Sequence, residues 1–215
     1  MGIKPAYISI ELRFHPCERF YPKRIDNLTI FPNAVPCYVS NGTYTWDNVT
    51  YDAVCYQFYY EANAAEGCGW CFCPQSKALG YHPFDVERIL VLHNKNGIPS
   101  MVYFSAHSKG QGMWVPWAEC EKTKDGALVV YVARGGHGTY PEGRTYWRIY
   151  GFANDVCSKR GRHLRVTNYI PSPGTKLADG IEVLSGIPQV SAKSITPWQR
   201  FWLPQYYKQV RFGKS

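Results

Sequence analysis

Histidines and carboxylates recur at the ends of strand-like segments in the middle of the chain. Three short motifs hold them: Tyr-His-Pro-Phe-Asp-Val-Glu at residues 81–87, Ser-Ala-His-Ser at 105–108 and Gly-Gly-His-Gly-Thr-Tyr-Pro at 135–141. Alternate residues of a strand point to one face, so the side chains of Asp85 and Glu87 can lie on the same face if this stretch is extended. Carboxylate oxygens with one imidazole suit Mg²⁺, Ca²⁺ or Mn²⁺ better than Zn²⁺. The pattern therefore predicts a divalent-cation site at His82, Asp85 and Glu87.

Two other interpretations of these residues stay open. In a purely structural interpretation, Asp85 and Glu87 pair with Arg88 or Arg134 at the rim of a sheet, and the histidines are packed and hydrogen-bonded. In the other, the protein is a hydrolase of unknown substrate. The hydrolase interpretation has less support, because the sequence holds no nucleophile elbow, no phosphate-binding loop and no His-Glu-x-x-His motif.

The order of these motifs resembles the vacuolar protein sorting-associated protein 62 family and the related NLP (necrosis-inducing) cytolysins. Residues 12–22, Leu-Arg-Phe-His-Pro-Cys-Glu-Arg-Phe-Tyr-Pro, resemble the opening strand and acidic turn of that group, and the resemblance covers roughly residues 8–150. The chain departs from the family at Val86, where a Trp is common, and at Phe84, where the cytolysins have a second His.

The resemblance implies an NLP-like antiparallel β-sandwich and a cation held by His82, Asp85 and Glu87. It places His107 beside these ligands and adds His137 and Tyr140 as binding residues. In the cytolysins the matching residues hold a divalent cation that is used to bind sphingolipid head groups of membranes. A metal-dependent glycolipid-binding or lytic protein is therefore one functional expectation.

Composition also favours an all-β fold, since the chain has 16% aromatic residues, 19 Gly and 15 Pro. The expected strands lie near 6–14, 53–60, 86–93, 100–106, 128–134 and 145–151, and the expected loops at 22–50, 61–81 and 107–127. Asn94-Lys95-Asn96-Gly97 predicts a hairpin turn between the third and fourth strands. Residues 89–92 are apolar on both faces, which is typical of a central strand covered on both sides. We expect one sandwich domain over residues 1–157.

The remaining residues, 158–215, are expected to form a basic, largely irregular extension. Residues 1–156 hold 14 basic and 14 acidic residues, so the formal net charge of +8 comes entirely from residues 157–215. Such asymmetry indicates an acidic surface, a membrane or a nucleic acid as partner, or a solvated extension. Aromatic and basic anchors of a protein interface follow near its end: Trp198, Phe201, Trp202, Tyr206, Tyr207, Lys208 and Arg211.

These features predict a non-enzymatic structural or binding component of a larger assembly, for example a minor capsid or coat-associated protein of a viral particle. In the opposing interpretation, the extension folds back over its own domain. No secretory signal pattern opens the sequence, so we expect cytoplasmic synthesis, with a location in a virion as one outcome. No run of 18 apolar residues occurs, so we expect no membrane span. The sequons at Asn27, Asn41 and Asn48 matter only in a glycosylating compartment.

Eight cysteines are many for a cytosolic chain and few for a disulfide scaffold. Cys68, Cys71 and Cys73 form one Cys-x-x-Cys-x-Cys cluster, whereas structural zinc sites use two spaced pairs of ligands. A fourth ligand such as Cys55 would have to come from elsewhere. The spacing thus argues against structural zinc and favours free thiols, with a disulfide as the alternative.

Overall fold

Strands account for nearly all the regular structure. The computed structural model describes residues 6–19, 21–23, 35–46, 48–63, 82–106, 112–147 and 154–171, with the side chains of the fourth strand described from Asp85 onward. The strands are β1 (Ile10–Phe14), β2 (Val35–Trp46), β3 (Val49–Asn63), β4 (His82–His93), β5 (Pro99–Phe104), β6 (Met113–Pro116), β7 (Leu128–Val132), β8 (Thr139–Tyr140), β9 (Thr145–Tyr146), β10 (Asp155–Val156) and β11 (His163–Pro171). No described helix is long and apolar enough to cross a membrane.

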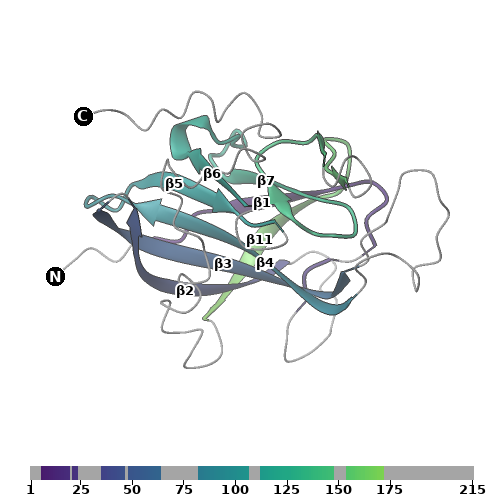
Figure 1. The fold of residues 1–215 in the computed structure, drawn as a ribbon, viewed down its shortest axis with the longest axis horizontal. Coiled ribbons are helices and arrows are strands. Elements are labelled where there is room, and N and C mark those ends of the chain that lie inside the picture. The colour runs from purple at the N-terminus through teal and green to yellow at the C-terminus, as the bar shows by residue number, and fades with distance from the viewer. Residues whose placement is uncertain are drawn as a thin grey trace.

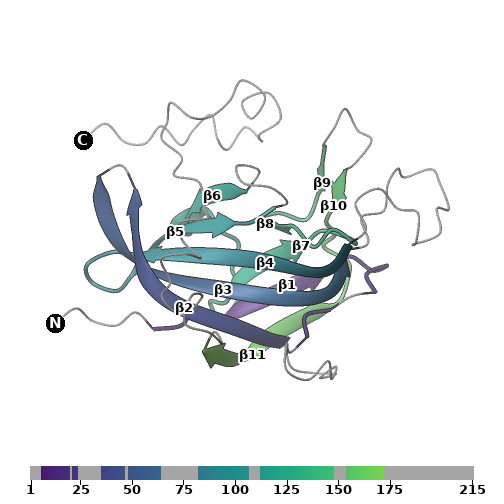
Figure 2. The ribbon, with the colours of Figure 1, turned by 60° about the horizontal axis from the view of Figure 1, so that its bottom comes forward.

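Nine of these strands form one sheet in the order β6-β5-β4-β3-β2-β11-β1-β7-β8. The pairs β1–β7 and β11–β2 are parallel and the others are antiparallel. The sheet folds over on itself, so that β1 and β7 form a layer opposite β3 and β4 (Figure 1 and Figure 2). At the open side, the Thr139 amide donates to the Ser105 carbonyl at 2.7 Å. The predicted all-β sandwich is confirmed, in the form of a nearly closed sheet.

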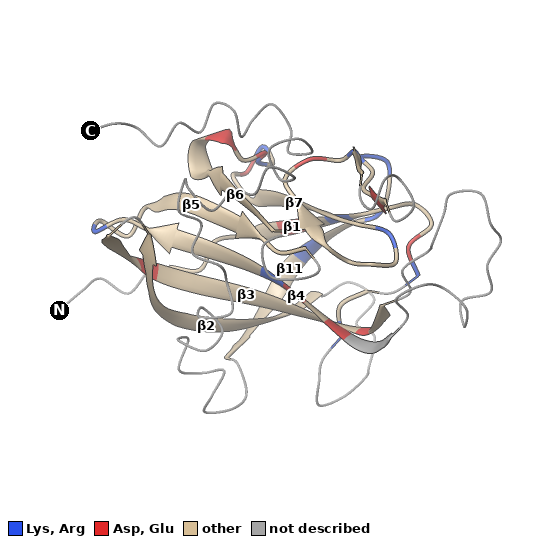
Figure 3. Ribbon diagram, viewed as in Figure 1, with Lys and Arg blue, Asp and Glu red and all other residues tan. Residues whose placement is uncertain are grey.

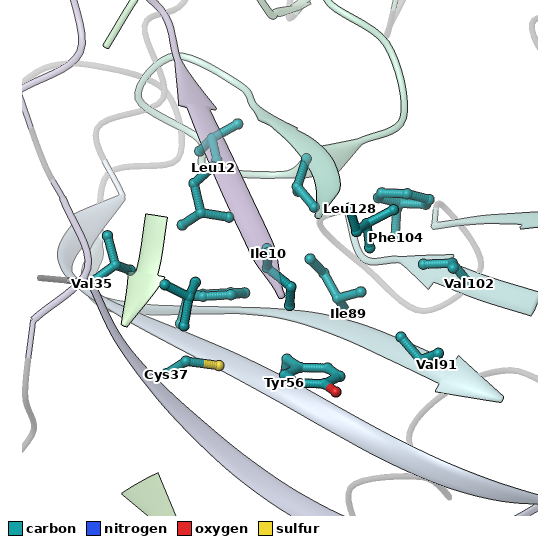
Figure 4. Close-up of a cluster of buried hydrophobic side chains, with 14 of the residues drawn as sticks. Ile10, Leu12, Val35, Cys37, Tyr56, Ile89, Val91, Val102, Phe104 and Leu128 are labelled. Carbon is teal, nitrogen blue, oxygen red and sulfur yellow. The ribbon is translucent and has the colours of Figure 1, made fainter. Parts of the chain in front are cut away.

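The main hydrophobic core lies between the two layers (Figure 4). It forms because inward positions of each strand are apolar: Ile10 and Leu12 of β1 face Tyr56 of β3 and Ile89 of β4, and all four are fully buried. The prediction of β4 and β5 as neighbours across a hairpin is also confirmed. Gly97 adopts a φ of 72° in the connecting turn, a left-handed conformation that glycine accepts without strain.

A second buried cluster covers the opposite face of β4 and β5. The β2–β3 hairpin bends out of the sheet at its tip (Figure 2), and Trp46 meets Trp114 of β6 edge to face with the ring centroids 4.6 Å apart. Leu90 and Leu92 lie in this cluster and are fully buried. The predicted coverage of β4 on both faces is therefore confirmed, and the cover comes in part from the hairpin.

The sequence-based strand assignment misses β2, β6, β11 and the two short strands β8 and β10. Pro36 and the Asn41-Gly42 pair are residue types that favour loops, yet both lie inside β2. This strand pairs with β3 from Tyr38 to Trp46. The domain boundary after residue 157 is wrong, because β11 lies between β1 and β2 in the middle of the sheet. The described domain extends to Pro171.

Because β11 belongs to the domain, part of the basic charge that was assigned to the extension belongs to the domain as well. Arg165 of β11 pairs with Asp125 at 3.1 Å and with Glu11 at 3.5 Å, and Figure 3 shows basic positions on β11 within the folded body. The turn before β11 is fixed against β1, because a Cβ on Gly161 would meet the Phe14 carbonyl oxygen at 1.5 Å. Residues 172–215 hold six basic and two acidic residues, so half of the +8 belongs to them. The seven predicted interface residues, Trp198 to Arg211, lie outside the described residues.

Candidate functional site

β4 carries the two carboxylates at one end of the sandwich. Asp85 and Glu87 point between the layers, with relative exposures of only 8% and 4%. Their neighbours across the ladder are Tyr60 and Phe58 of β3, whose side chains share the same inward face. The two-residue spacing therefore places both carboxylates on the face that meets the other layer. Figure 3 shows acidic positions at this end of β4.

His137 comes to these carboxylates from the opposite layer. It lies in the turn between β7 and β8 with φ at 52°, a left-handed value that is uncommon for a side chain other than glycine. Its Nδ1 lies 3.0 Å from Oδ2 of Asp85, and its Nε2 lies 3.6 Å from Oε1 of Glu18. The imidazole also stacks on the Tyr60 ring, with centroids 4.0 Å apart and planes 2° apart. A fully buried histidine is thus held between two carboxylates.

Glu18 belongs to this centre, although sequence reasoning did not select it, nor did it select Tyr60 and Asp155. Glu18 follows β1 in a turn, and its side chain is only 1% exposed. Its carboxylate accepts hydrogen bonds of 2.8 Å from the amides of Arg19 and Gly135. The bond to Gly135 ties this turn to the β7–β8 turn that carries His137. The only sequence signal for Glu18 is its place in the acidic turn of residues 12–22.

A polar network extends the centre along β5, β8 and β10. The Ser105 hydroxyl donates to Glu87 and accepts from the Arg88 amide at 2.7 Å. Tyr140 donates its hydroxyl to Asp155, another buried carboxylate. Together with Asp85, Glu87 and Glu18, Asp155 brings the buried carboxylates at this end to four. Tyr140, predicted as a binding residue, therefore holds Asp155, whose charge contributes to raising the pKa of Glu87.

The charges of the centre are not balanced by His137 alone. Burial, together with the nearby charge of Asp85, raises the pKa of Glu87 well above 4.5. Burial opposes protonation of His137, but its hydrogen bond to Asp85 and the nearby carboxylate of Glu18 outweigh that effect and raise its pKa above 6.5. The Tyr60 hydroxyl is buried without a hydrogen-bond partner, and burial and the three carboxylates around it raise its pKa well above 10. The centre is thus rich in oxygen donors and negative charge.

The structure brings Asp85, Glu87, His137 and Tyr140 into one region. The side chain of His82, and His107 as a whole, lie outside the described residues, as do Cys68, Cys71 and Cys73. Among described residues, no three His, Cys, Asp or Glu side chains are arranged so that they could hold a metal ion. The chemistry of the donors still fits a hard cation, since carboxylate and hydroxyl oxygens predominate. Two carboxylates are therefore in place, and the remaining ligand predicted from the sequence is His82.

The five described cysteines, Cys17, Cys37, Cys55, Cys120 and Cys157, are all free thiols. Comparisons with protein-family models, with curated proteins and with solved structures find no match to this chain.

Proposed function

We propose that this protein is a non-enzymatic binding protein whose acidic centre takes up a divalent cation. The observation that carries the proposal is the pair of buried carboxylates of Asp85 and Glu87, which share the inner face of β4 and oppose Glu18 and His137 from the other layer. Asp85 and Glu87 would supply oxygen ligands, and His82 an imidazole. A bound Mg²⁺, Ca²⁺ or Mn²⁺ would add positive charge beside these carboxylates.

The charge state of Glu87 supports this proposal. Burial and the neighbouring Asp85 carboxylate disfavour the ionised form of Glu87, which raises its pKa well above 4.5. A cation next to both groups favours the ionised form, so binding should release a proton from Glu87. The Tyr60 hydroxyl, which is buried and has no hydrogen-bond partner, adds a neutral oxygen at the same place.

The polar network argues for binding rather than hydrolysis. The Ser105 hydroxyl is committed to Glu87 as donor and to the Arg88 amide as acceptor. A nucleophilic serine donates to a base that a third group orients, and it keeps its oxygen open for attack, whereas the Ser105 oxygen already accepts from the Arg88 amide. The buried carboxylates around His137 are held in place by it. No described hydroxyl in the centre is placed to act as a nucleophile.

Calorimetric titration of Mn²⁺ and Ca²⁺ into the purified full chain tests the proposal. Wild type is expected to bind one cation with release of protons, detected as a heat that depends on the ionisation enthalpy of the buffer. Asp85→Ala is expected to weaken binding at least tenfold, because one charged ligand is lost. Glu119→Gln removes an exposed carboxylate and serves as the control, with unchanged binding expected. Identical titrations of wild type and Asp85→Ala contradict the proposal.

A second candidate function is that of a structural component of a larger assembly. The composition of residues 172–215 favours it, since this segment joins a net charge of +4 to the aromatic residues Trp198, Phe201, Trp202, Tyr206 and Tyr207. Trp, Tyr and Arg are the commonest anchors of protein interfaces. A chain that stops after Pro171 is expected to lose the partners that co-purify with the full chain from its source. Equal partner recovery by both chains counts against this candidate.

A further inference from the structure

The outer face of β3 and β4, which points away from the main core, carries an amide and a guanidinium side by side. Tyr56, Phe58 and Ile89 point into the main core. Gln57 of β3 and Arg88 of β4 alternate with these residues, so they point to the outer face. The register pairs Gln57 directly with Arg88 across the two strands. Paired positions of antiparallel strands have Cβ atoms about 4.5–5.5 Å apart, so the two side chains are neighbours.

The Gln57 side chain is fully buried and uses only one end of its amide. Its Oε1 accepts a hydrogen bond of 2.9 Å from the Tyr59 hydroxyl, whereas its Nε2 has no hydrogen-bond partner among the described residues. The Cys55 thiol beside this amide is a weak acceptor and stays neutral, since burial raises its pKa to about 12. The Ser40 hydroxyl of β2 is also buried without a described partner, and Ser40 pairs with Cys55 on the same face. Folded proteins satisfy nearly all buried polar groups, so two unsatisfied groups at one place point to a ligand.

Arg88 adds an unbalanced positive charge to this face. Its Nε is buried, and its guanidinium forms no hydrogen bond or ion pair with the described residues. Asp85 and Glu87 lie on the inner face of β4, and Glu61, an acidic residue on the outer face of β3, is paired with Lys23. The described part of the outer face therefore brings no carboxylate to the guanidinium.

The charge of Arg88 acts on the side chains on either side of Gln57. Burial raises the pKa of Tyr59, and the positive charge of Arg88 opposes that rise. The same two effects act on the pKa of Cys55. Tyr59 and Cys55 flank Gln57 on the outer face of β3, so the guanidinium lies beside the free end of the amide. Arg88 and Tyr59 are only half-buried, which leaves this place open to solvent on their side.

We propose that Arg88, Gln57 and Ser40 bind a single phosphate group. The guanidinium offers parallel N–H donors that fit two phosphate oxygens. A tetrahedral phosphate has further oxygens for the Gln57 amide and the Ser40 hydroxyl, whereas a planar carboxylate is already satisfied by the guanidinium. β2, β3 and β4 contain no Lys and no Arg besides Arg88, so the face suits one phosphate rather than the repeated phosphates of a nucleic acid or an anionic membrane. The ligand is therefore small, either inorganic phosphate or a phosphomonoester.

Calorimetric titration of inorganic phosphate and of glycerol phosphate into the full chain, with a chelator present, tests the inference. Wild type is expected to bind phosphate, with sulfate competing and chloride at the same ionic strength not competing. Tighter binding of glycerol phosphate assigns the site to a phosphomonoester, and tighter binding of inorganic phosphate assigns it to the free anion. In NMR spectra of the isotope-labelled chain, the signals of the Gln57 side-chain amide and of the Arg88 Nε–H should shift as phosphate is added.

Two substitutions separate the site from a general effect of charge. Arg88→Lys keeps the positive charge but loses the paired donors, so phosphate binding is expected to weaken about tenfold. Gln57→Glu keeps the size of the side chain and places a carboxylate beside the guanidinium, so it is expected to abolish phosphate binding. Lys124→Gln removes an exposed positive charge from the turn before β7 and should leave phosphate binding unchanged.

The outcomes separate this inference from the cation centre. Phosphate binding that survives the chelator and the Asp85→Ala substitution supports the site, whatever the cation titration shows. Phosphate binding that is absent in wild type, that requires a divalent cation, or that chloride displaces equally well overturns the inference. Binding that is unchanged in both Arg88→Lys and Gln57→Glu, or phosphate shifts that leave the signals of Gln57 and Arg88 in place, overturns it as well.

Discussion

A chain that stops after Cys157 is expected to remain unfolded, whereas a chain that stops after Pro171 is expected to fold. The difference is β11, which pairs with β1 through Leu164 and Arg165 and with β2 through Tyr169 and Ile170. Its Val166 is buried in the main core, and the Tyr169 hydroxyl donates to the Ile8 carbonyl at 2.8 Å. Loss of β11 separates the two halves of the sheet and leaves two long strand edges unpaired.

Far-UV circular dichroism and thermal unfolding of the two truncated chains measure this difference. The chain ending at Pro171 should give a strand-rich spectrum and one cooperative transition, as expected of a single domain. The chain ending at Cys157 should show neither, and it should aggregate through its exposed edges. A cooperative transition in the shorter chain would show that β11 is dispensable and that the sheet closes without it.

The second large effect is expected from His137→Ala. Removing the imidazole leaves Asp85 and Glu18 buried without the cation that lies between them, and breaking a buried ion pair in this way costs about 3–5 kcal/mol. His163→Ala removes a histidine whose side chain is 42% exposed and should change stability by under about 0.5 kcal/mol. Denaturant unfolding of both variants near pH 6 measures these losses. A loss below about 1 kcal/mol in His137→Ala would mean that the carboxylates are balanced by other groups.

The same ion pair predicts how stability depends on pH. The pKa of His137 is raised in the folded state, so its contribution is complete below the unfolded value of 6.5 and is lost as pH rises through the raised pKa. Glu87 acts in the same direction, because its raised pKa means that the unfolded chain ionises first as pH rises above 4.5. Without added cation, wild type is therefore expected to lose stability from about pH 4.5 upward through Glu87, and from about pH 6.5 upward through His137 as well. The gap to His137→Ala should narrow over that range, and a constant gap would contradict the assignment.

The parts of this account that the sequence predicted are those that depend on neighbours along the chain. The two-residue spacing of Asp85 and Glu87 is enough to put them on one face, and the apolar run at 89–92 is enough to indicate a strand covered on both sides. The Asn94–Gly97 turn fixes the β4–β5 pair, because a tight turn sets the register of the strands it joins.

The parts that the sequence did not predict depend on contacts between distant segments. β11 has a weakly alternating, half-exposed pattern, and its place is decided by β1 and β2, which lie more than 120 residues earlier. Glu18 and His137 meet Asp85 only because the sheet folds over and brings two turns of the opposite layer above β4. Periodicity gives the face on which a residue lies, but it does not say which strand stands opposite.

The most direct measurement of the central claim is the anomalous scattering of Mn²⁺ in crystals of the full chain grown with that ion. One strong peak is expected between the Asp85 and Glu87 carboxylates, about 2.0–2.3 Å from their oxygens, with His82 turned toward it. The peak should vanish in crystals of Asp85→Ala grown in the same way. A peak elsewhere, or an electron-density map that shows Asp85 still bound to His137 and no ion beside Glu87, would contradict the proposed cation centre.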